Sequence, residues 1–320
     1  MRNLFWNSNE GRPRAFWRIL AQVVLMIVLL LAAGALLGDF RRTFPGKGLV
    51  TLAGIGGSVI LAARWFDRRP IQGLGLHRGR AWLLDFAFGC VLGIVLMSAI
   101  FLFLTGIDWA DVRDTLVVRE EGRFLPAFVG ALFFFLCVGI TEELWMRGYL
   151  IPNLAEAIHS RRIAPRAAVL LALVLSSVTF GVLHVANPNA SVVSTLGVVF
   201  AGIVLGLPFI WTGSLAVPIG LHFTWNSAQG LLYGFPVSGT EDFPSIYDAE
   251  ASGPAAWTGG PFGPEAGLVS VLALILGAIL IRVWVNARKG AASVRAELAL
   301  PPVDAGPEFT PTGEASHAGT

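Results

Sequence analysis

Two adjacent acidic residues close a long apolar run, and this feature constrains the fold more than any other in the sequence. The run covers residues 124–140 and continues into Thr141-Glu142-Glu143-Leu144-Trp145-Met146-Arg147. A carboxylate in the middle of a membrane helix costs roughly 2.5 to 3.5 kcal/mol on insertion scales, so two of them need compensation. On a helix Glu143 and Arg147 lie one turn apart with the acid first, and we expect them to form an ion pair. Glu142 points about 100° away from that face and has no partner in its own segment, which makes it a candidate functional residue.

The composition identifies the class of protein. The 320 residues are 55% hydrophobic and only 14% charged, whereas soluble domains average about 25% charged residues. The mean hydropathy is +0.69. We therefore predict an all-α fold, a polytopic bundle of transmembrane helices whose first partner is the lipid bilayer. The net charge of +2 gives no support for nucleic-acid binding. Cys90 and Cys137 fall inside apolar runs, so we expect buried thiols and no disulfide framework.

Apolar stretches of spanning length recur along the chain. A helix needs about 20 predominantly apolar residues to cross a bilayer. We count eight such stretches, of which the first is a retained span, at residues 19–38, 49–66, 81–105, 124–140, 167–184, 191–211, 214–232 and 266–285.

The positions of arginine and lysine predict how the bundle is oriented. Seventeen of the 23 basic residues lie in four segments: the N-terminus, the loop after the second span, the stretch after the fourth and the C-terminus. The intervening loops hold the other six. We therefore expect a multi-pass protein of the plasma (inner) membrane with both termini cytoplasmic. The loop over residues 233–265 contains several acids and no lysine or arginine, which suits the outer face.

These patterns divide the chain into six regions. The tail after Arg295 is rich in proline and lacks a periodic apolar pattern, so we expect the whole C-terminal region to be cytoplasmic and disordered. The regions are a cytoplasmic N-terminal segment (1–18), the first three spans with their loops (19–123), a membrane core that carries the polar clusters (124–232), an extracytoplasmic acidic loop (233–265), the last span (266–285) and the tail (286–320).

Two further polar clusters at membrane depth have helical spacing. Phe180-x-x-x-His184 ends the fifth span, and His222-x-x-x-Asn226 lies in the seventh. Each has a structural interpretation, because a histidine can cap a helix end and a His/Asn pair can form hydrogen bonds between helices in lipid. Together with Glu142 they supply a carboxylate and a histidine that could take a proton from water, and donors for a developing oxyanion. That set is typical of a hydrolase, and since no serine or cysteine has a matching base, water is the expected nucleophile.

A metal site is the alternative use of the same side chains. Glu142, His184 and His222 could supply three zinc ligands and leave the fourth position to water. The His-Glu-x-x-His motif is absent, so the spacing does not demand a metal. We commit to no metal ligands, and zinc remains a possible cofactor.

The three motifs in their order resemble those of the CPBP intramembrane proteases, also called the type II CAAX prenyl endopeptidase or ABI family. The resemblance rests on Glu142-Glu143-x-x-x-Arg147, Phe180-x-x-x-His184 and His222-x-x-x-Asn226, and covers about residues 124–232. It implies that Glu142 is the general base, acting on water with His184. It also implies that His222 and Asn226 stabilise the oxyanion while Glu143 and Arg147 orient the site. The expected substrate is a membrane-associated peptide or protein, and both the glutamate mechanism and a metal-dependent one remain open.

Two other classes of function compete with an enzyme. A non-catalytic scaffold or bacteriocin-immunity protein would keep the motifs as hydrogen bonds between helices. An ion or proton transporter would use Glu142 as a relay, although no repeats or paired broken spans are visible.

The depth of the site residues in the membrane is a separate question, because we expect Glu142 near the cytoplasmic end of its span and His184 at the outer end of the next. Asn187-Pro188-Asn189 is expected to be a simple turn that does not line the site.

Overall fold

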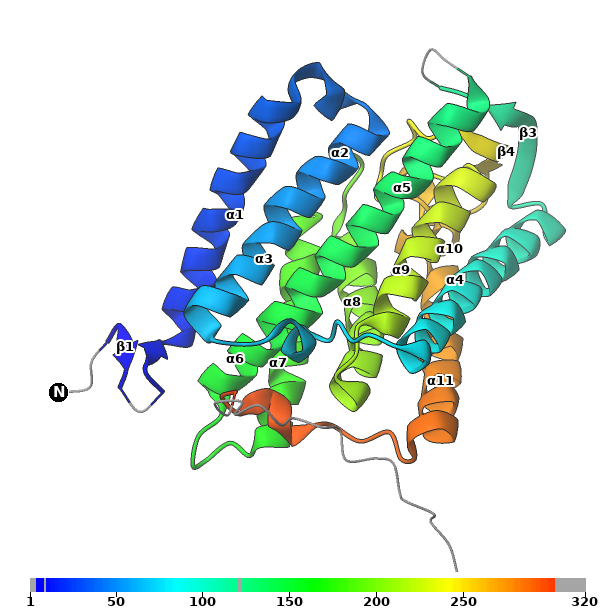
Figure 1. The fold of residues 1–320 in the computed structure, drawn as a ribbon. Coiled ribbons are helices and arrows are strands. Elements are labelled where there is room, and N and C mark those ends of the chain that lie inside the picture. Colours follow the sequence, from blue (N-terminus) through cyan, green and yellow to red (C-terminus); the bar gives the residue numbers. More distant parts are fainter. Residues whose placement is uncertain (1–3, 9, 120–122, 303–320) are drawn as a thin grey trace, which may run out of the picture.

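The computed structural model describes residues 4–8, 10–119 and 123–302, and it confirms the all-α transmembrane bundle (Figure 1). Two small antiparallel sheets pair β1 (Trp6–Asn7) with β2 (Arg12–Pro13) and β3 (Ala110–Val117) with β4 (Ser245–Ala251). The helices are α1 (Ala15–Leu37), α2 (Phe44–Thr51), α3 (Gly57–Ala62), α4 (Arg80–Gly106), α5 (Phe124–Glu143), α6 (Ile151–Ile158), α7 (Pro165–Leu183), α8 (Val192–Thr212), α9 (Ala216–Ser227), α10 (Ala255–Thr258) and α11 (Leu268–Lys289).

Seven helical segments within the described residues are long and apolar enough to cross a membrane. They correspond to seven of the eight predicted spans. The remaining prediction, residues 214–232, forms the twelve residues of α9 and a five-residue π-helical turn, Ala228–Leu232, which together are shorter than the other seven. This short helix is almost fully enclosed in the bundle, since ten of its twelve residues are buried.

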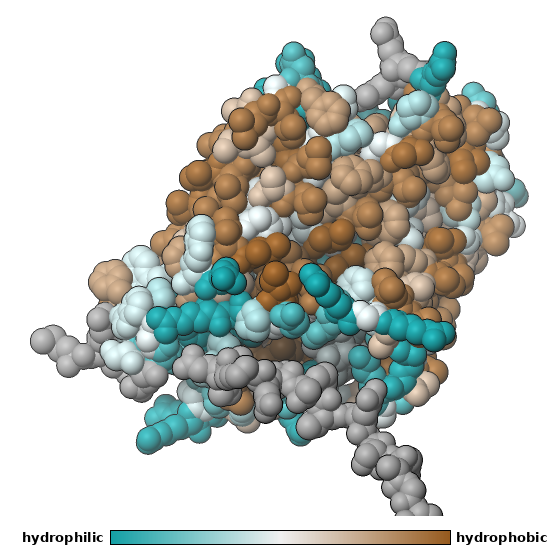
Figure 2. All heavy atoms as spheres, viewed as in Figure 1, coloured by the Kyte–Doolittle hydropathy of each residue, from teal (hydrophilic) through white to brown (hydrophobic). Residues whose placement is uncertain are grey.

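The surface has the polarity expected of a membrane protein. Figure 2 shows a broad apolar band with hydrophilic residues gathered below it and at its upper edge. Many of the exposed apolar side chains belong to α1, among them Leu20, Val24 and Leu31. One polar contact fixes α1 to its neighbours inside the band, because Gln22 accepts from Trp145 Nε1 at 2.9 Å and donates to Ser58 Oγ at 3.0 Å. Lipid-facing helices need such contacts, since apolar side chains gain little by leaving lipid for protein.

Close backbone contacts hold α9 in the centre, beside α4 and α5 (Figure 1). A Cβ added at Gly89 of α4 would come within 2.5 Å of the Val217 carbonyl oxygen. One added at Gly220 of α9 would come within 2.3 Å of the Phe86 oxygen. Small residues at a helix interface allow this approach, which is a common source of helix association in membranes. These glycines therefore fix the position of the helix that carries His222 and Asn226.

The helix that carries the two acids is longer than the sequence pattern predicts. α5 continues through a π-helical segment (Leu144–Leu150) into α6, giving one helical run of 35 residues, Phe124–Ile158. Glu142 is the nineteenth of those residues and thus lies near the middle of the helical run. α7 ends at His184, which lines the same cavity as Glu142. The depths of the two residues in the membrane stay predictions.

The predicted acidic loop is a folded cap. Its strand β4 pairs with β3 from the α4–α5 connection. Phe243 stacks on Phe44 at a ring-centroid distance of 5.4 Å and also contacts the Phe135 ring at 4.6 Å. The cap also contacts the turn between α7 and α8, where Asn189 Nδ2 donates to the Pro261 oxygen at 3.4 Å. The cap therefore closes the end of the bundle opposite the start of α1 (Figure 1).

A buried ionic cluster fastens the other end. The Glu156 carboxylate of α6 accepts from Arg12 at 2.8 Å, from Arg18 at 2.7 Å and from Arg69 at 2.5 Å. Arg18 is also paired with Asp67 at 3.1 Å. Burial lowers the pKa of Arg69, which lies in the loop after α3. The cluster joins the start of α1, the end of the second helical segment (Phe44–Asp67) and α6.

The C-terminal region differs from the expected disordered tail over its described part. α11 extends to Lys289, and a 3₁₀ turn at Ala296–Ala299 buries Leu298 and Ala299 against α6 and α7. Arg295 contributes a further contact by donating to the Thr212 oxygen at 3.0 Å. The segment was hard to recognise because its apolar residues are few and pack only against distant helices. The expectation for residues 303–320 lies outside the described residues.

Candidate active site

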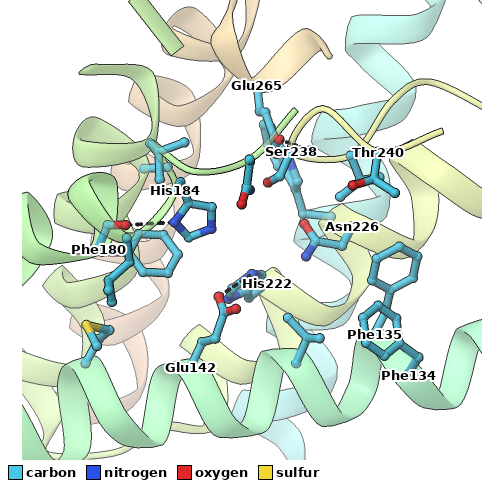
Figure 3. A pocket seen from close by; sticks show the side chains of 18 of the residues that line it. Phe134, Phe135, Glu142, Phe180, His184, His222, Asn226, Ser238, Thr240 and Glu265 are labelled. Atoms are coloured by element: carbon cyan, nitrogen blue, oxygen red, sulfur yellow. Dashed lines mark hydrogen bonds and ion pairs between the residues drawn. The ribbon is translucent and has the colours of Figure 1, made fainter. Parts of the chain in front are cut away.

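A cavity of about 640 Å³ lies inside the bundle, between α5, α7, α9 and the cap. Polar side chains from all of these elements reach it (Figure 3). Its wall also has an extensive apolar part, which includes Met26 and Leu30 of α1 and Val138 of α5. Of the six site residues predicted from sequence, Glu142, His184, His222 and Asn226 line this cavity, and Glu143 and Arg147 lie directly behind its wall.

Glu143 organises the buried side of the site. The expected ion pair is present, with Arg147 Nη1 at 3.0 Å from Glu143 Oε1. Both side chains are almost completely buried. Arg147 also donates to the Gly202 carbonyl of α8 at 3.1 Å, and its guanidinium lies 4.7 Å from the centre of the Phe180 ring. These contacts explain how a charged pair is accommodated in the middle of an apolar helix.

The second contact of Glu143 orients His222. The Nδ1 atom of His222 lies 2.8 Å from Glu143 Oε1 and donates to it, because a carboxylate can only accept. This bond turns the Nε2 atom toward the cavity, where it is 3.8 Å from Glu142 Oε2. The geometry resembles the support that a buried carboxylate gives to a functional histidine in many hydrolases. Glu143 thus positions a histidine, and Glu142 faces the space where chemistry could occur.

The two adjacent acids have opposite environments. The Glu143 side chain is 0% exposed, whereas that of Glu142 is 26% exposed, and the exposed part faces the cavity (Figure 3). Neighbours on a helix point about 100° apart, so one can be buried while the next lines a cavity. Glu142 is therefore the carboxylate available to a bound water or substrate.

His184 is held by the residue one turn before it. Its Nδ1 atom donates to the Phe180 carbonyl oxygen at 2.7 Å, at the point where α7 ends. A neutral imidazole with its proton on Nδ1 carries a lone pair on Nε2, which can accept from water. The Phe180 ring packs edge-on against the His184 ring at 4.6 Å and lies 6.1 Å from His222. Phe180 thus contacts both imidazoles and the Arg147 guanidinium, which accounts for its place in the motif.

Asn226 follows His222 by one helical turn and belongs to the same face of α9. Its side chain points into the cavity beside His222 (Figure 3). The Asn226 amide and His222 thus line the same side of the cavity. A pair of donors that converge in this way is the geometry that stabilises a developing oxyanion.

Several lining residues were missed by the sequence patterns. Glu265 and Ser238 come from the cap, and Asn187 comes from the turn after α7, which was expected not to line the site. None has a helical spacing to the motif residues, since each lies on a separate segment brought in by tertiary structure. The one available signal was the position of Glu265, a lone acid immediately before the last apolar run.

The donor set does not fit a metal site. In the part of the chain that the structure describes, no three His, Cys, Asp or Glu side chains are grouped so that they could hold one ion. Glu142, His184 and His222 are therefore arranged around a cavity and do not form a three-ligand zinc centre.

The family model described as type II CAAX prenyl endopeptidase, Rce1-like, matches residues 124–228. This match supports assignment of the membrane core to the CPBP family. The matched CPBP segment includes all three motifs and ends before the cap, so Glu265 lies outside it. No curated protein and no solved structure matches the chain. The match supports a multi-pass membrane protein with the general function of a CAAX-type membrane protease.

Proposed function

We propose that the protein is an intramembrane endopeptidase that hydrolyses a peptide bond of a membrane-associated protein or peptide. The observation that carries this proposal is the convergence of Glu142, His184, His222 and Asn226, from three separate helices, on one cavity within the apolar band. A cavity at this depth suits a substrate that is itself held in the membrane. The match to the type II CAAX prenyl endopeptidase model makes prenylated proteins one candidate class, and the apolar wall of the cavity is compatible with such a group.

Water is the nucleophile in the proposed reaction. A water molecule between Glu142 and the Nε2 atom of His184 would lose a proton to the Glu142 carboxylate as it attacks the carbonyl carbon. His184 would orient that water by accepting its second hydrogen. General base catalysis of this kind typically contributes about 100- to 10,000-fold to a rate. Every step uses side chains of this chain, and none requires a metal ion.

The oxyanion would be stabilised by the α9 pair. As the carbonyl oxygen becomes negative, it would accept from the Asn226 amide and from the Nε2–H of His222. That second bond requires a doubly protonated imidazole, and the carboxylates of Glu143 and Glu142 at 2.8 and 3.8 Å favour this form. Because Arg147 already balances the charge of Glu143, the doubly protonated His222 would balance that of Glu142. Loss of one such donor usually costs about 100- to 1,000-fold in rate.

The scaffold alternative accounts for only part of the site. Hydrogen bonding between helices explains Glu143, Arg147 and His222, which join α5, α8 and α9. The bond from His184 to the Phe180 carbonyl fits a helix cap, but the scaffold alternative does not explain why Glu142 is aimed into a cavity. We therefore favour the enzyme.

The proposed topology follows from the arginines. The end of the bundle that carries the N-terminal segment, the α6–α7 connection and the end of α11 would face the cytoplasm, and the cap would face outward across the plasma (inner) membrane.

The test compares new protein termini in cells that produce the wild type or Glu142→Gln at matched levels. We expect a set of termini that is present with the wild type and absent with the variant. The matched control is Glu241→Gln, which changes an exposed acid of the cap in the same way and should leave the set intact. Identical termini with the wild type and Glu142→Gln would overturn the proposal.

A further inference from the structure

A third carboxylate enters the cavity from the cap. Glu265 lies in a 3₁₀ turn (Pro264–Ala266) just before α11, outside the segment that matches the CPBP family. It lines the same cavity as Glu142, His184 and His222. In Figure 3 Glu265 and Glu142 occupy opposite sides of the cavity, with His184 and Asn226 between them. No motif of the membrane core accounts for an acid in this position.

The position of Glu265 is fixed by its surroundings. Its Oε1 atom accepts from the Ser238 backbone N–H at 2.5 Å. The turn itself is held by Ser270 Oγ, which donates to the Pro264 oxygen at 2.6 Å. It also packs tightly on α8, because a Cβ at Gly197 would come within 2.8 Å of the Glu265 carbonyl oxygen. The side chain therefore enters the cavity from a rigid part of the cap.

The environment of Glu265 favours a neutral carboxyl group. Burial raises the pKa of Glu265, although the Ser238 hydrogen bond and the nearby His184 and His222 act in the opposite direction. The other charged side chains that line the cavity are Glu142 on α5, Lys47 on α2 and Asp242 in the cap. The partial exposure of Glu265 is toward this cavity. A carboxyl group with a raised pKa keeps its proton to higher pH, and a protonated carboxyl group can donate.

Peptide hydrolysis needs such a donor as well as a base. The amide nitrogen is a poor leaving group until it is protonated, and Glu142 would hold the proton taken from water on the side of attack. Transfer of that proton to the nitrogen would require Glu142 to reach across the tetrahedral intermediate. A second carboxyl group on the opposite side removes this requirement, as in other two-carboxyl sites where one group acts as base and the other as acid.

We propose that Glu265 is the general acid that protonates the leaving amine, an inference that rests on the proposed function. In the first step the water oxygen bonds to the carbonyl carbon and one water proton passes to Glu142. In the second the carbon–nitrogen bond breaks, its electron pair stays on nitrogen, and nitrogen takes the proton from Glu265. The products are a carboxylic acid and an amine. Glu142 then loses its proton to cavity water and Glu265 regains one, which restores the starting state.

The experiment measures the purified enzyme on two substrates. Both are based on a cleavage sequence identified by the comparison of termini. One is the peptide amide, and the other carries the same acyl sequence as an aryl ester, whose phenolate leaves without protonation. With Glu265→Gln, which keeps an acceptor for Ser238, we expect amide cleavage to fall roughly 100- to 10,000-fold. Aryl ester cleavage should fall far less. Glu265→Asp should recover part of the amide activity, and Glu241→Gln should match the wild type on both substrates.

The wild type provides a second readout that does not depend on any variant folding. Loss of the His222 proton at alkaline pH should slow both substrates, whereas loss of the Glu265 proton should slow only the amide, so the ratio of amide to aryl ester rates should fall as pH rises. Equal amide rates for the wild type and Glu265→Gln would overturn the inference. So would equal losses on amide and ester, or a ratio of amide to ester rates that stays constant as pH rises. Because Glu142→Gln abolishes both reactions only if the proposed function holds, failure of the acid role is distinguishable from failure of that function.

Discussion

His222 donates its Nδ1–H to Glu143 over 2.8 Å, while its Nε2 atom lies 3.8 Å from Glu142. The imidazole thus separates two acids that are adjacent in the chain, one buried behind it and one facing the cavity. The two glutamates therefore have different roles. Removal of Glu143 should harm the fold, and removal of Glu142 should harm the chemistry.

Glu143→Gln should destabilise the protein strongly. It leaves the buried Arg147 guanidinium without its anion, and breaking one side of a buried pair costs about 3–5 kcal/mol. Glu142→Gln should change stability by roughly 1 kcal/mol or less, because that side chain faces the cavity. Denaturant unfolding in micelles would measure both free energies. Equal losses of unfolding free energy in the two variants would contradict a structural role for Glu143 alone.

Phe180→Leu should separate ring contacts from the backbone bond that holds His184. The variant keeps the carbonyl oxygen that accepts from His184 but removes the ring beneath Arg147. A cation–π contact of this kind contributes roughly 0.5–2 kcal/mol. We expect a loss of stability in that range, and Leu175→Ala, on an exposed position of the same helix, should cost less. A larger drop in melting temperature for Leu175→Ala than for Phe180→Leu would contradict a stabilising contact between the Phe180 ring and Arg147.

Gly89→Ala should disturb the packing of α9, whereas Gly106→Ala in the same helix should not. The added Cβ at Gly89 would lie 2.5 Å from the Val217 oxygen, and the one at Gly106 would meet nothing within 4 Å. A shift of α9 would move His222 and Asn226 together. We therefore expect lower melting temperature and lower activity for the first variant alone. Wild-type behaviour of Gly89→Ala would show that the helix interface is looser than the structure indicates.

Glu156→Gln should loosen the end of the bundle that carries the ionic cluster. It removes the common acceptor of Arg12, Arg18 and Arg69, whose side chains are all largely buried. We expect a loss of about 3–5 kcal/mol in the free energy of unfolding. The control is Glu297→Gln, because Glu297 is 71% exposed and lies 3.8 Å from Arg295. Hydrogen exchange at the start of α1 should increase only in the first variant.

The pH dependence of stability should reveal Glu265. Burial raises the pKa of this carboxyl in the folded state above its unfolded value. Its contribution is therefore fully present below the unfolded pKa and is lost as pH rises through the folded pKa. Glu265→Gln cannot titrate, so its melting temperature should gain on that of the wild type as pH rises across this window. Parallel melting curves over the whole range would mean that the carboxyl is not held neutral by the fold.

The sequence predicted the spans well because apolar length is a local property. The observed helices begin and end within a few residues of most predicted stretches, as α4 (Arg80–Gly106) does for residues 81–105. The helix from Phe124 extended furthest beyond its prediction, because Glu143 and Arg147 look like a boundary until their partners are known. The Gly202 carbonyl and His222, which satisfy them, lie on other helices.

The site was predictable where its residues share helices and not where they come from loops. Glu142, Glu143 and Arg147 are linked by helical spacing, and so are His222 and Asn226. Glu265 has no such link, since the cap that carries it is built from the pairing of β4 with β3 and from aromatic contacts with distant helices. Long-range pairing of this kind leaves no periodic signal in a single sequence.

Single-turnover cleavage by the purified protein tests the central claim most directly. The substrate is a peptide that carries a cleavage site identified in cells, and the wild type is compared with Glu142→Gln under conditions where both are folded. We predict that the wild type cleaves it and that the variant is slower by roughly 100- to 10,000-fold, because the base that activates water is missing. Cleavage at the same rate by both proteins would contradict the assignment of Glu142 and with it the proposed mechanism.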